Sequence, residues 1–183
     1  QGKYDAILKG SRDLFNGIPS FWFKPWIDTE HIKKNNIPKN HLIGFCGNRN
    51  PQRNDFIDRL TEKYNMKQDI FVIGEDMVDA INSYHIHFNK NLGDPHGLSY
   101  RVIETLACDT LLLTNNSYMN EELGLINKKN CLIYDSFGDI IELIEWVQNE
   151  NMIEDISKEG YKIHKNFSCE NRAKELIYIL ENI

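Results

Sequence analysis

Several protein classes are excluded by what this sequence lacks. It contains no Cys-x-x-Cys or Cys/His cluster of metal-ligand spacing, and His85 and His87 share a strand face without a third ligand nearby, so no metal site is predicted. The longest apolar runs cover five or six residues, whereas roughly 20 are needed to cross a membrane, and we expect no transmembrane segment. Walker and Gly-x-Gly-x-x-Gly patterns are also absent.

Cysteine is scarce as well. The four cysteines are Cys46, Cys108, Cys131 and Cys169. Three of them stand among apolar residues, as small buried hydrophobes do, and we expect a protein of a reducing compartment, the cytoplasm.

Positive charge is in deficit. The 21 Lys and Arg residues are outnumbered by 27 Asp and Glu residues, which gives a formal net charge of −6. Nucleic-acid-binding domains usually carry a basic face, so we expect no nucleic-acid partner. A phosphate site remains compatible with this composition, because a few well-placed Arg side chains suffice locally. The length of 183 residues suits one domain with appendages.

Short apolar runs alternate with longer amphipathic segments. The candidate strands are Tyr4–Leu8, Phe21–Phe23, Leu42–Cys46, Ile70–Ile73, His85–Asn89, Thr110–Thr114 and Cys131–Tyr134. The candidate helices are Asn54–Tyr64, Gly97–Asp109, Asp139–Gln148, Ile153–His164 and Asn171–Ile183. This order predicts an α/β fold, a Rossmann-like doubly wound parallel sheet, in which ligands bind at the carboxyl ends of the strands.

One such end is the loop Gly47–Arg53, which joins a strand to a helix. Gly47 lets a ligand approach the backbone, and a helix N-terminus offers free N–H groups to an anion. Arg49 and Arg53 could pair with a diphosphate there. The alternative is a solvated polar loop with Pro51 at the start of the helix.

The segment Asn89–Cys108 carries a Gly/Asp/Pro-rich loop that leads into a helix. Gly97, Arg101 and Glu104 are spaced so that they share one helix face. In a functional interpretation, Arg101 neutralises a phosphate and Glu104 accepts hydrogen bonds from ribose hydroxyls. The alternative is a helix salt bridge that contributes only a few tenths of a kcal/mol.

The sequence HGLSYRVIETLACDTLLLTN (His96–Asn115) resembles a glycosyltransferase pattern. In that pattern a loop Gly precedes a helix with Arg-x-x-Glu, followed by Ala-Cys-Gly and an apolar strand. Other segments resemble the same family in the same order: Trp26–Ile32, Ile43–Arg53, Val72–Gly74, Ser83–Asn89, Cys131–Asp135, Phe137–Ile144 and Lys165–Leu176. The chain is thus similar to the C-terminal, donor-binding half of GT-B glycosyltransferases, and in particular to the CgeB-like (spore-maturation-protein-like) group related to the group 1 family.

The resemblance implies roles for individual residues. Glu104 matches the glutamate that binds the donor ribose, Arg101 the arginine near the diphosphate, and Arg53 the basic position of the first loop. Gly74 and Glu75 stand where the nucleobase packs against backbone. The other expected donor contacts are Gly47, Asn48, Gly97, Ser99 and Tyr100.

Three positions depart from the related retaining enzymes. His96 stands eight residues before Glu104, where those enzymes have Glu. Asn48 matches the Arg of their first loop, and Asp109 replaces the Gly after Ala-Cys. These differences fit the CgeB-like group better, and they leave the catalytic residues and the stereochemical outcome unassigned.

The function implied is transfer of a sugar from a UDP- or GDP-linked donor to an unknown acceptor, without a metal or other cofactor. We expect residues 1–25 to be a tag remnant followed by a linker from a missing N-terminal acceptor-binding domain, and residues 26–183 to be the nucleotide-sugar-binding domain. Without that domain or a partner chain, the protein should be inactive or weakly active. The alternative is a non-catalytic nucleotide-binding or receiver-like module, which needs clustered acidic residues at strand ends, whereas Asp5 is isolated.

Overall fold

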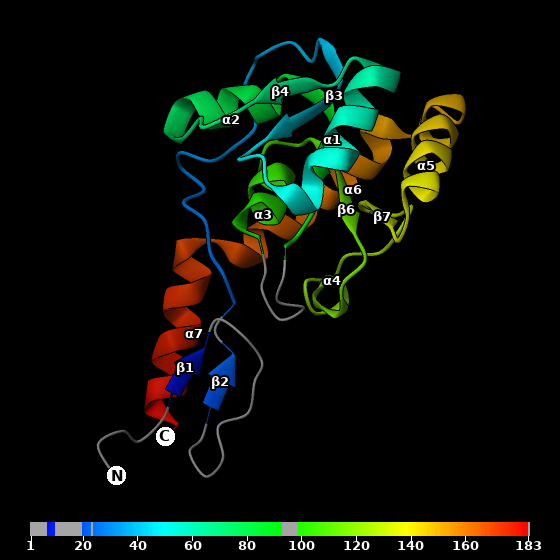
Figure 1. Cartoon of the computed structure of the whole chain (residues 1–183). Helices are drawn as coiled ribbons and strands as arrows, with labels where there is room; N and C mark the ends of the chain where they lie inside the picture. The colour runs from blue at the N-terminus through cyan, green and yellow to red at the C-terminus, as the bar shows by residue number, and fades with distance from the viewer. Residues whose placement is uncertain (1–6, 10–19, 23, 93–98, 183) are drawn as a thin grey trace.

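The computed structural model describes residues 7–9, 20–22, 24–92 and 99–182 (Figure 1). Its strands are β1 (Ile7–Lys9), β2 (Ser20–Trp22), β3 (His41–Cys46), β4 (Lys67–Asp69), β5 (Tyr84–Asn89), β6 (Leu111–Asn115) and β7 (Leu132–Tyr134). Its helices are α1 (Pro51–Tyr64), α2 (Gly74–Asn82), α3 (Tyr100–Ala107), α4 (Tyr118–Glu122), α5 (Phe137–Asn149), α6 (Ile153–His164), the 3-10 helix η1 (Lys165–Phe167) and α7 (Cys169–Glu181).

Strands β3 to β7 form an all-parallel sheet of five strands in the order β4-β3-β5-β6-β7. Counted from β3, this order is 2-1-3-4-5, a doubly wound arrangement that reverses direction between β3 and β5. Ile43 lies opposite Ile86, and Leu113 lies opposite Leu132. The predicted fold class is therefore confirmed, and the switch point lies between β3 and β5.

Helices cover both faces of this sheet, as Figure 1 shows. Leu111 and Leu113 of β6 belong to a buried cluster that includes Ile57 of α1 and residues of α5. Leu112, between them, belongs to a second cluster with Ile103 of α3. Alternate residues of a strand point to opposite faces, so α1 and α5 cover one face and α3 the other.

Strand β3 contains a glycine because a tyrosine of β5 lies across it. A Cβ on Gly44 would come within 2.3 Å of the Tyr84 ring. The Tyr84 hydroxyl donates a hydrogen bond to the carboxylate of Asp69 on β4. Burial, together with this bond, raises the pKa of Tyr84 well above its usual range. One side chain therefore connects three neighbouring strands.

The strand predicted at Ile70–Ile73 is wrong. Strand β4 is Lys67–Asp69, and the apolar residues after it leave the sheet, with Phe71 and Ile73 78% and 80% exposed. The residues of β4 are exposed or half-buried, so this strand pairs through its backbone without an apolar run, unlike β7 at the other side of the sheet. The apolar run therefore predicted this strand three residues after its position in the structure.

The helices agree better with the pattern. The predicted helix Ile153–His164 is confirmed as α6. Helices α2 and α4 were not among the predicted helices. Helix α3 is described from Tyr100, whereas the predicted start at Gly97 lies outside the described residues.

Residues 24–40, between β2 and β3, which we call the linker, are hydrogen-bonded to the segment around the start of α7. Ile27 N–H donates to Phe167 O at 2.9 Å, and Cys169 N–H donates to Ile27 O at 3.2 Å. Strands β1 and β2 form a separate parallel pair, and Figure 1 shows this pair and α7 at the same end of the molecule. The linker and the start of α7 thus meet at one place.

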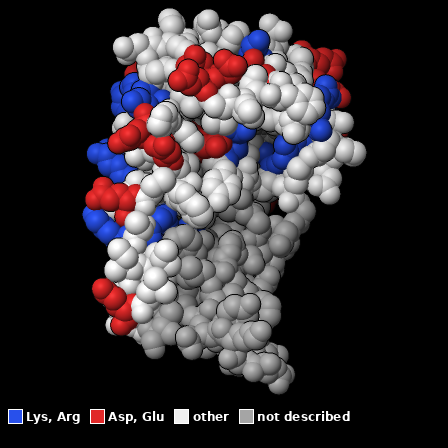
Figure 2. Space-filling view, turned by 90° about the vertical axis from the view of Figure 1, so that its left-hand side faces the viewer, with Lys and Arg blue, Asp and Glu red and all other residues white. Residues whose placement is uncertain are grey.

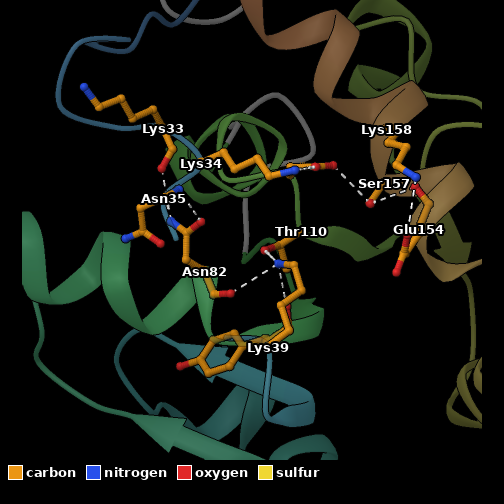
Figure 3. Close-up of polar contacts among 11 residues, drawn as sticks. Lys33, Lys34, Asn35, Lys39, Asn82, Thr110, Glu154, Ser157 and Lys158 are labelled. Carbon is orange, nitrogen blue, oxygen red and sulfur yellow. Dashed lines mark hydrogen bonds and ion pairs between the residues drawn. The ribbon is translucent and has the colours of Figure 1, made fainter. Parts of the chain in front are cut away.

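At the amino edge of the sheet, formed by the first residues of β3, β5 and β6, a half-buried lysine donates to three acceptors (Figure 3). The Lys39 Nζ atom donates to Asn82 O at 3.3 Å, Tyr84 O at 2.9 Å and Thr110 Oγ1 at 2.7 Å. Burial lowers the pKa of Lys39 to about 8. Because each of its three N–H groups has an acceptor, the ammonium is satisfied.

A second lysine at this edge pairs with Asp109. Lys34 Nζ lies 2.7 Å from Asp109 Oδ2, and the Ser157 hydroxyl donates to Asp109 Oδ1 at 3.1 Å. Asp109 has φ 49°, in the left-handed region that favours glycine. This explains why the glycosyltransferase pattern has Gly here; Asp109 accepts the strained conformation and supplies a carboxylate.

Candidate functional site

The loop after β3 begins where the pairing between β3 and β5 stops. That pairing ends at Gly44, opposite His87, although β3 continues to Cys46. Gly47 still pairs with β4, because its N–H donates to Asp69 O at 3.1 Å. We call the end of the sheet formed by the last residues of β3, β5 and β6 the carboxyl edge, and the switch point opens there.

Arg53, in the first turn of α1, is a half-buried cation at this edge. Its Nη1 donates to Asn48 O at 3.1 Å and its Nη2 to Lys90 O at 2.8 Å, while its buried Nε has no partner. Burial lowers the pKa of Arg53, and the nearby charge of Arg101 lowers it further. No carboxylate among the described residues pairs with Arg53, so nothing in that part of the chain compensates its charge through an ion pair.

Lys90 adds a second such cation and was missed by sequence reasoning. Its Nζ lies 4.1 Å from the centroid of the Phe56 ring, and within the described part of the chain it forms no ion pair. Burial and the neighbouring Arg53 both lower the pKa of Lys90. The available signal was its position directly after the last residue of β5.

Arg101 and Glu104 are brought together as both interpretations required. Arg101 Nη1 lies 2.7 Å from Glu104 Oε2, with side-chain exposures of 21% and 13%. Burial raises the pKa of Glu104, and Arg101 opposes that shift. The helix salt bridge therefore exists. Among the described residues, however, only Oε2 of Glu104 has a hydrogen-bond partner, and Oε1 remains able to accept.

The start of α3 also offers donors. Ser99 is its N-cap residue and forms no side-chain capping bond. The first N–H groups of a helix lack intrahelical partners and attract anions. Tyr100 is 48% exposed, and its ring packs edge-to-face against Trp26 with centroids 6.4 Å apart. The site helix thus contacts the linker.

A buried histidine links β3 to α3 beneath these residues. Cys46 N–H donates to His87 Nε2 at 3.2 Å, and His87 Nδ1 lies 2.6 Å from Thr105 Oγ1. The Thr105 hydroxyl donates to Arg101 O at 2.6 Å. Burial lowers the pKa of His87 to about 3, and Arg101 adds to the shift, so the ring is neutral. Sequence reasoning weighed His87 only as a metal ligand.

Three predicted residues are not joined to this cluster by any contact among the described residues. Gly74 is the first residue of α2, with φ +59° and open space around it. Glu75 lies exposed in the first turn of the same helix. Gly97 lies outside the described residues. Their roles as donor contacts stay predictions.

Other kinds of site find less support. The described residues contain no group of three His, Cys, Asp or Glu side chains that could hold a metal ion, and none of their helices is long and apolar enough to cross a membrane. Figure 2 shows acidic and basic side chains intermingled on the described part of one face. A pocket at the α5–α6 turn has His85, Gln148, Asn151, Ile153, Glu154 and Asp155 as its lining. Its two carboxylates disfavour an anionic ligand.

Comparison with solved structures finds the same fold in glycosyltransferases. Sucrose-phosphate synthase from Thermosynechococcus elongatus superimposes with a TM-score of 0.69 at 13% identity, over 97% of this chain and 58% of that one. Anabaena HepE in complex with UDP-glucose gives 0.71 at 10% identity, over 90% and 58%. The C-terminal domain of the Francisella tularensis group 1 protein LpcC gives 0.59 at 12% identity, over 76% and 97%.

The chain thus spans 58% of the length of sucrose-phosphate synthase and of HepE. A search of curated proteins found no match. A family model described as "Glycosyl transferase-like" matches residues 29–178, which is most of the chain. The chain therefore belongs to the glycosyl transferase-like family and has the fold of the C-terminal half of a GT-B glycosyltransferase.

Proposed function

We propose that this chain binds the nucleoside diphosphate of a sugar donor and is the donor half of an enzyme that transfers the sugar to an acceptor. The observation that carries the proposal is the group of cations at the carboxyl edge. Arg53 and Lys90 are partly desolvated without a carboxylate among the described residues, and Arg101 adds to the same field. In a chain of net charge −6, such a local excess favours an anionic ligand.

A diphosphate fits this arrangement. Arg53 lies in the first turn of α1 and Lys90 directly after β5, and the uncapped start of α3 supplies backbone N–H groups. Arg53 and Lys90, together with Arg101 in its pair with Glu104, supply positive charge that a metal ion would otherwise bring. We therefore propose that binding needs no metal, and that chelation with EDTA leaves the affinity unchanged.

The ribose is assigned to Glu104. Its Oε1 has no partner among the described residues, and Arg101 orients the carboxylate through Oε2. A carboxylate accepts hydrogen bonds from two adjacent hydroxyls, which suits a ribose diol. The salt bridge and the binding role are therefore compatible, because they use different oxygen atoms.

Uridine nucleotides are the first donors to test. HepE was solved with UDP-glucose, and the pneumococcal O-GlcNAc transferase GtfA with UDP and GlcNAc. Both share only the fold with this chain, so GDP and dTDP belong in the same panel. We propose that the acceptor site lies on an N-terminal domain or partner chain, and that this chain alone turns over slowly because nothing closes over the donor.

The test is a calorimetric titration with UDP, uridine, pyrophosphate and 2′,3′-dideoxy-UDP. Glu104→Gln keeps the size of the side chain and should weaken UDP by about 1–3 kcal/mol, the range for hydrogen bonds to charged groups. The loss should be much smaller for the dideoxy analogue. Glu145→Gln on α5, which breaks the exposed pair with Lys63 of α1, is the matched control and should bind UDP like the wild type.

Equal losses for UDP and dideoxy-UDP would reduce Glu104 to a partner of Arg101. Absence of binding by every nucleoside diphosphate at millimolar concentration would refute the proposed function as a whole.

A further inference from the structure

The N–H group of Cys46 is placed where the sheet cannot satisfy it. Gly47, the next residue, directs its N–H to Asp69 on β4. Successive N–H groups of a strand point to opposite sides, so the N–H of Cys46 faces β5. The pairing with β5 has already ended at Gly44. A buried N–H without an acceptor is costly, and the His87 ring supplies one at 3.2 Å.

The hydrogen bonds through His87 all have the same donor-to-acceptor direction. His87 Nε2 accepts from Cys46, so the neutral ring carries its proton on Nδ1. Nδ1 then donates to Thr105 Oγ1 at 2.6 Å. The Thr105 hydroxyl is left to donate to Arg101 O at 2.6 Å. Each donor has one acceptor, and the chain of bonds crosses from β3 through β5 to α3.

The two ends of this chain are the two halves of the proposed site. Cys46 immediately precedes Gly47, where the loop to Arg53 begins, and Arg101 carries the side chain that pairs with Glu104. His87 and Thr105 are both fully buried, so their side chains are not accessible to a ligand at the surface. They fix the distance between the loop after β3 and the first turn of α3.

We propose that His87 and Thr105 are positioning residues that set the spacing between the phosphate-binding loop and the Arg101–Glu104 turn. This proposal rests on the proposed function, because the ligand that senses the spacing is a nucleoside diphosphate bound to both elements. A ligand bound to only one of them, such as uridine held through Glu104, is insensitive to the spacing.

The test compares Thr105→Val with Thr105→Ser in the 183-residue chain. Valine keeps the shape but removes the hydroxyl, whereas serine keeps the hydroxyl. Thr105→Val should weaken UDP about tenfold, as expected for one buried hydrogen bond, and leave uridine nearly unchanged. Thr105→Ser should bind like the wild type.

Thr110→Val is the matched control. Thr110 is a buried threonine at the amino edge, and its hydroxyl donates to Ile81 O at 2.9 Å. This variant should lose at least as much stability as Thr105→Val, with no change in UDP affinity. If Thr105→Val lowers stability while UDP affinity stays at the wild-type value, the pair is structural only and the proposal is overturned.

A second readout needs no ligand. In the free protein, Thr105→Val should shift the amide resonances of Cys46 and Gly47, and Thr105→Ser should restore them. Unshifted resonances would disprove the coupling. If these resonances shift but wild-type protein binds no nucleotide, the coupling stands and the proposed function fails, so the two failures are distinguishable.

Discussion

The cations at the two edges of the sheet differ in their interaction partners. At the amino edge, Lys39 has three acceptors and Lys34 has the carboxylate of Asp109 (Figure 3). At the carboxyl edge, Arg53 and Lys90 have only carbonyl or ring partners and no carboxylate among the described residues. Both edges are partly buried, so burial does not explain the difference. The hydrogen-bonded and ion-paired lysines of the amino edge stabilise the fold. The cations of the carboxyl edge, without a carboxylate partner among the described residues, can instead pair with a negatively charged ligand.

Mutations at the amino edge should lower the stability of the protein more than mutations at the carboxyl edge. Lys39→Met removes the donor to three acceptors and should lower the free energy of unfolding by about 2–4 kcal/mol, because buried acceptors are left unpaired. Urea denaturation measures the loss. UDP affinity, titrated well below the melting temperature, should stay unchanged. A stability change below ~1 kcal/mol would contradict the importance of this network.

Mutations at the carboxyl edge should lower the affinity for UDP more than they lower stability. Arg53→Ala removes an uncompensated cation and should weaken UDP by about 1.5–3 kcal/mol, roughly tenfold to a hundredfold, with less effect on unfolding than Lys39→Met. The affinity difference should shrink as salt rises, because charge pairing at a partly open site is screened. The exposed Arg59 on the same helix provides the control Arg59→Ala. Unchanged affinity with a large stability loss would make Arg53 a structural residue.

The edges should also differ in their response to acid. Lys39, with a pKa of about 8, stays charged below neutral pH, whereas His87, with a pKa of about 3, stays neutral. The unfolded chain protonates His87 near pH 6.5 and binds the extra proton, so its contribution to stability falls as pH drops from about 6.5 towards 3. The slope approaches about 1.4 kcal/mol per pH unit.

Urea denaturation between pH 5 and 6.5 checks this slope, at pH values chosen to lie above most carboxyl pKa values, about 4. The variants His85→Gln, His164→Gln and Glu104→Gln each remove another shifted group and give the contributions to subtract. A remaining slope near zero would mean that His87 protonates in the folded state.

The sequence predicted the sheet better than it predicted the network beneath the site. Continuous apolar runs located β3, β5, β6 and β7 to within one residue, because buried parallel strands require such runs. The rule that ligands bind at the carboxyl ends of strands predicted that Arg53 and Arg101 lie near each other, and the charge of Arg101 does act on Arg53, while their role in binding stays a prediction. Strand β4 was missed because its residues are exposed or half-buried and carry no apolar run, whereas β7, the other edge strand, has buried Leu132 and Tyr134.

The remaining features depend on three-dimensional register. The sequence does not show that β3 continues to Cys46 after its pairing with β5 has ended at Gly44. This unpaired end is the reason that the His87 ring accepts the hydrogen bond of the Cys46 N–H group. The position of Lys90 directly after β5 was a signal in the sequence, but its proximity to Arg53, which donates to its carbonyl, depends on the fold. The Asp that replaces Gly at position 109 is likewise explained by the structure, because its φ lies in the left-handed region that favours glycine.

The contact between Ile27 and the residues around Ser168 bears on how the chain folds as it is synthesised. Ile27 is buried, and its backbone partners Phe167 and Cys169 lie about 140 residues later in the sequence. The ribosome therefore releases Ile27 long before its partners exist, and the linker must wait unpaired while the sheet assembles. Contacts of such separation form late and slow folding. Docking of the linker should therefore be the last step of folding.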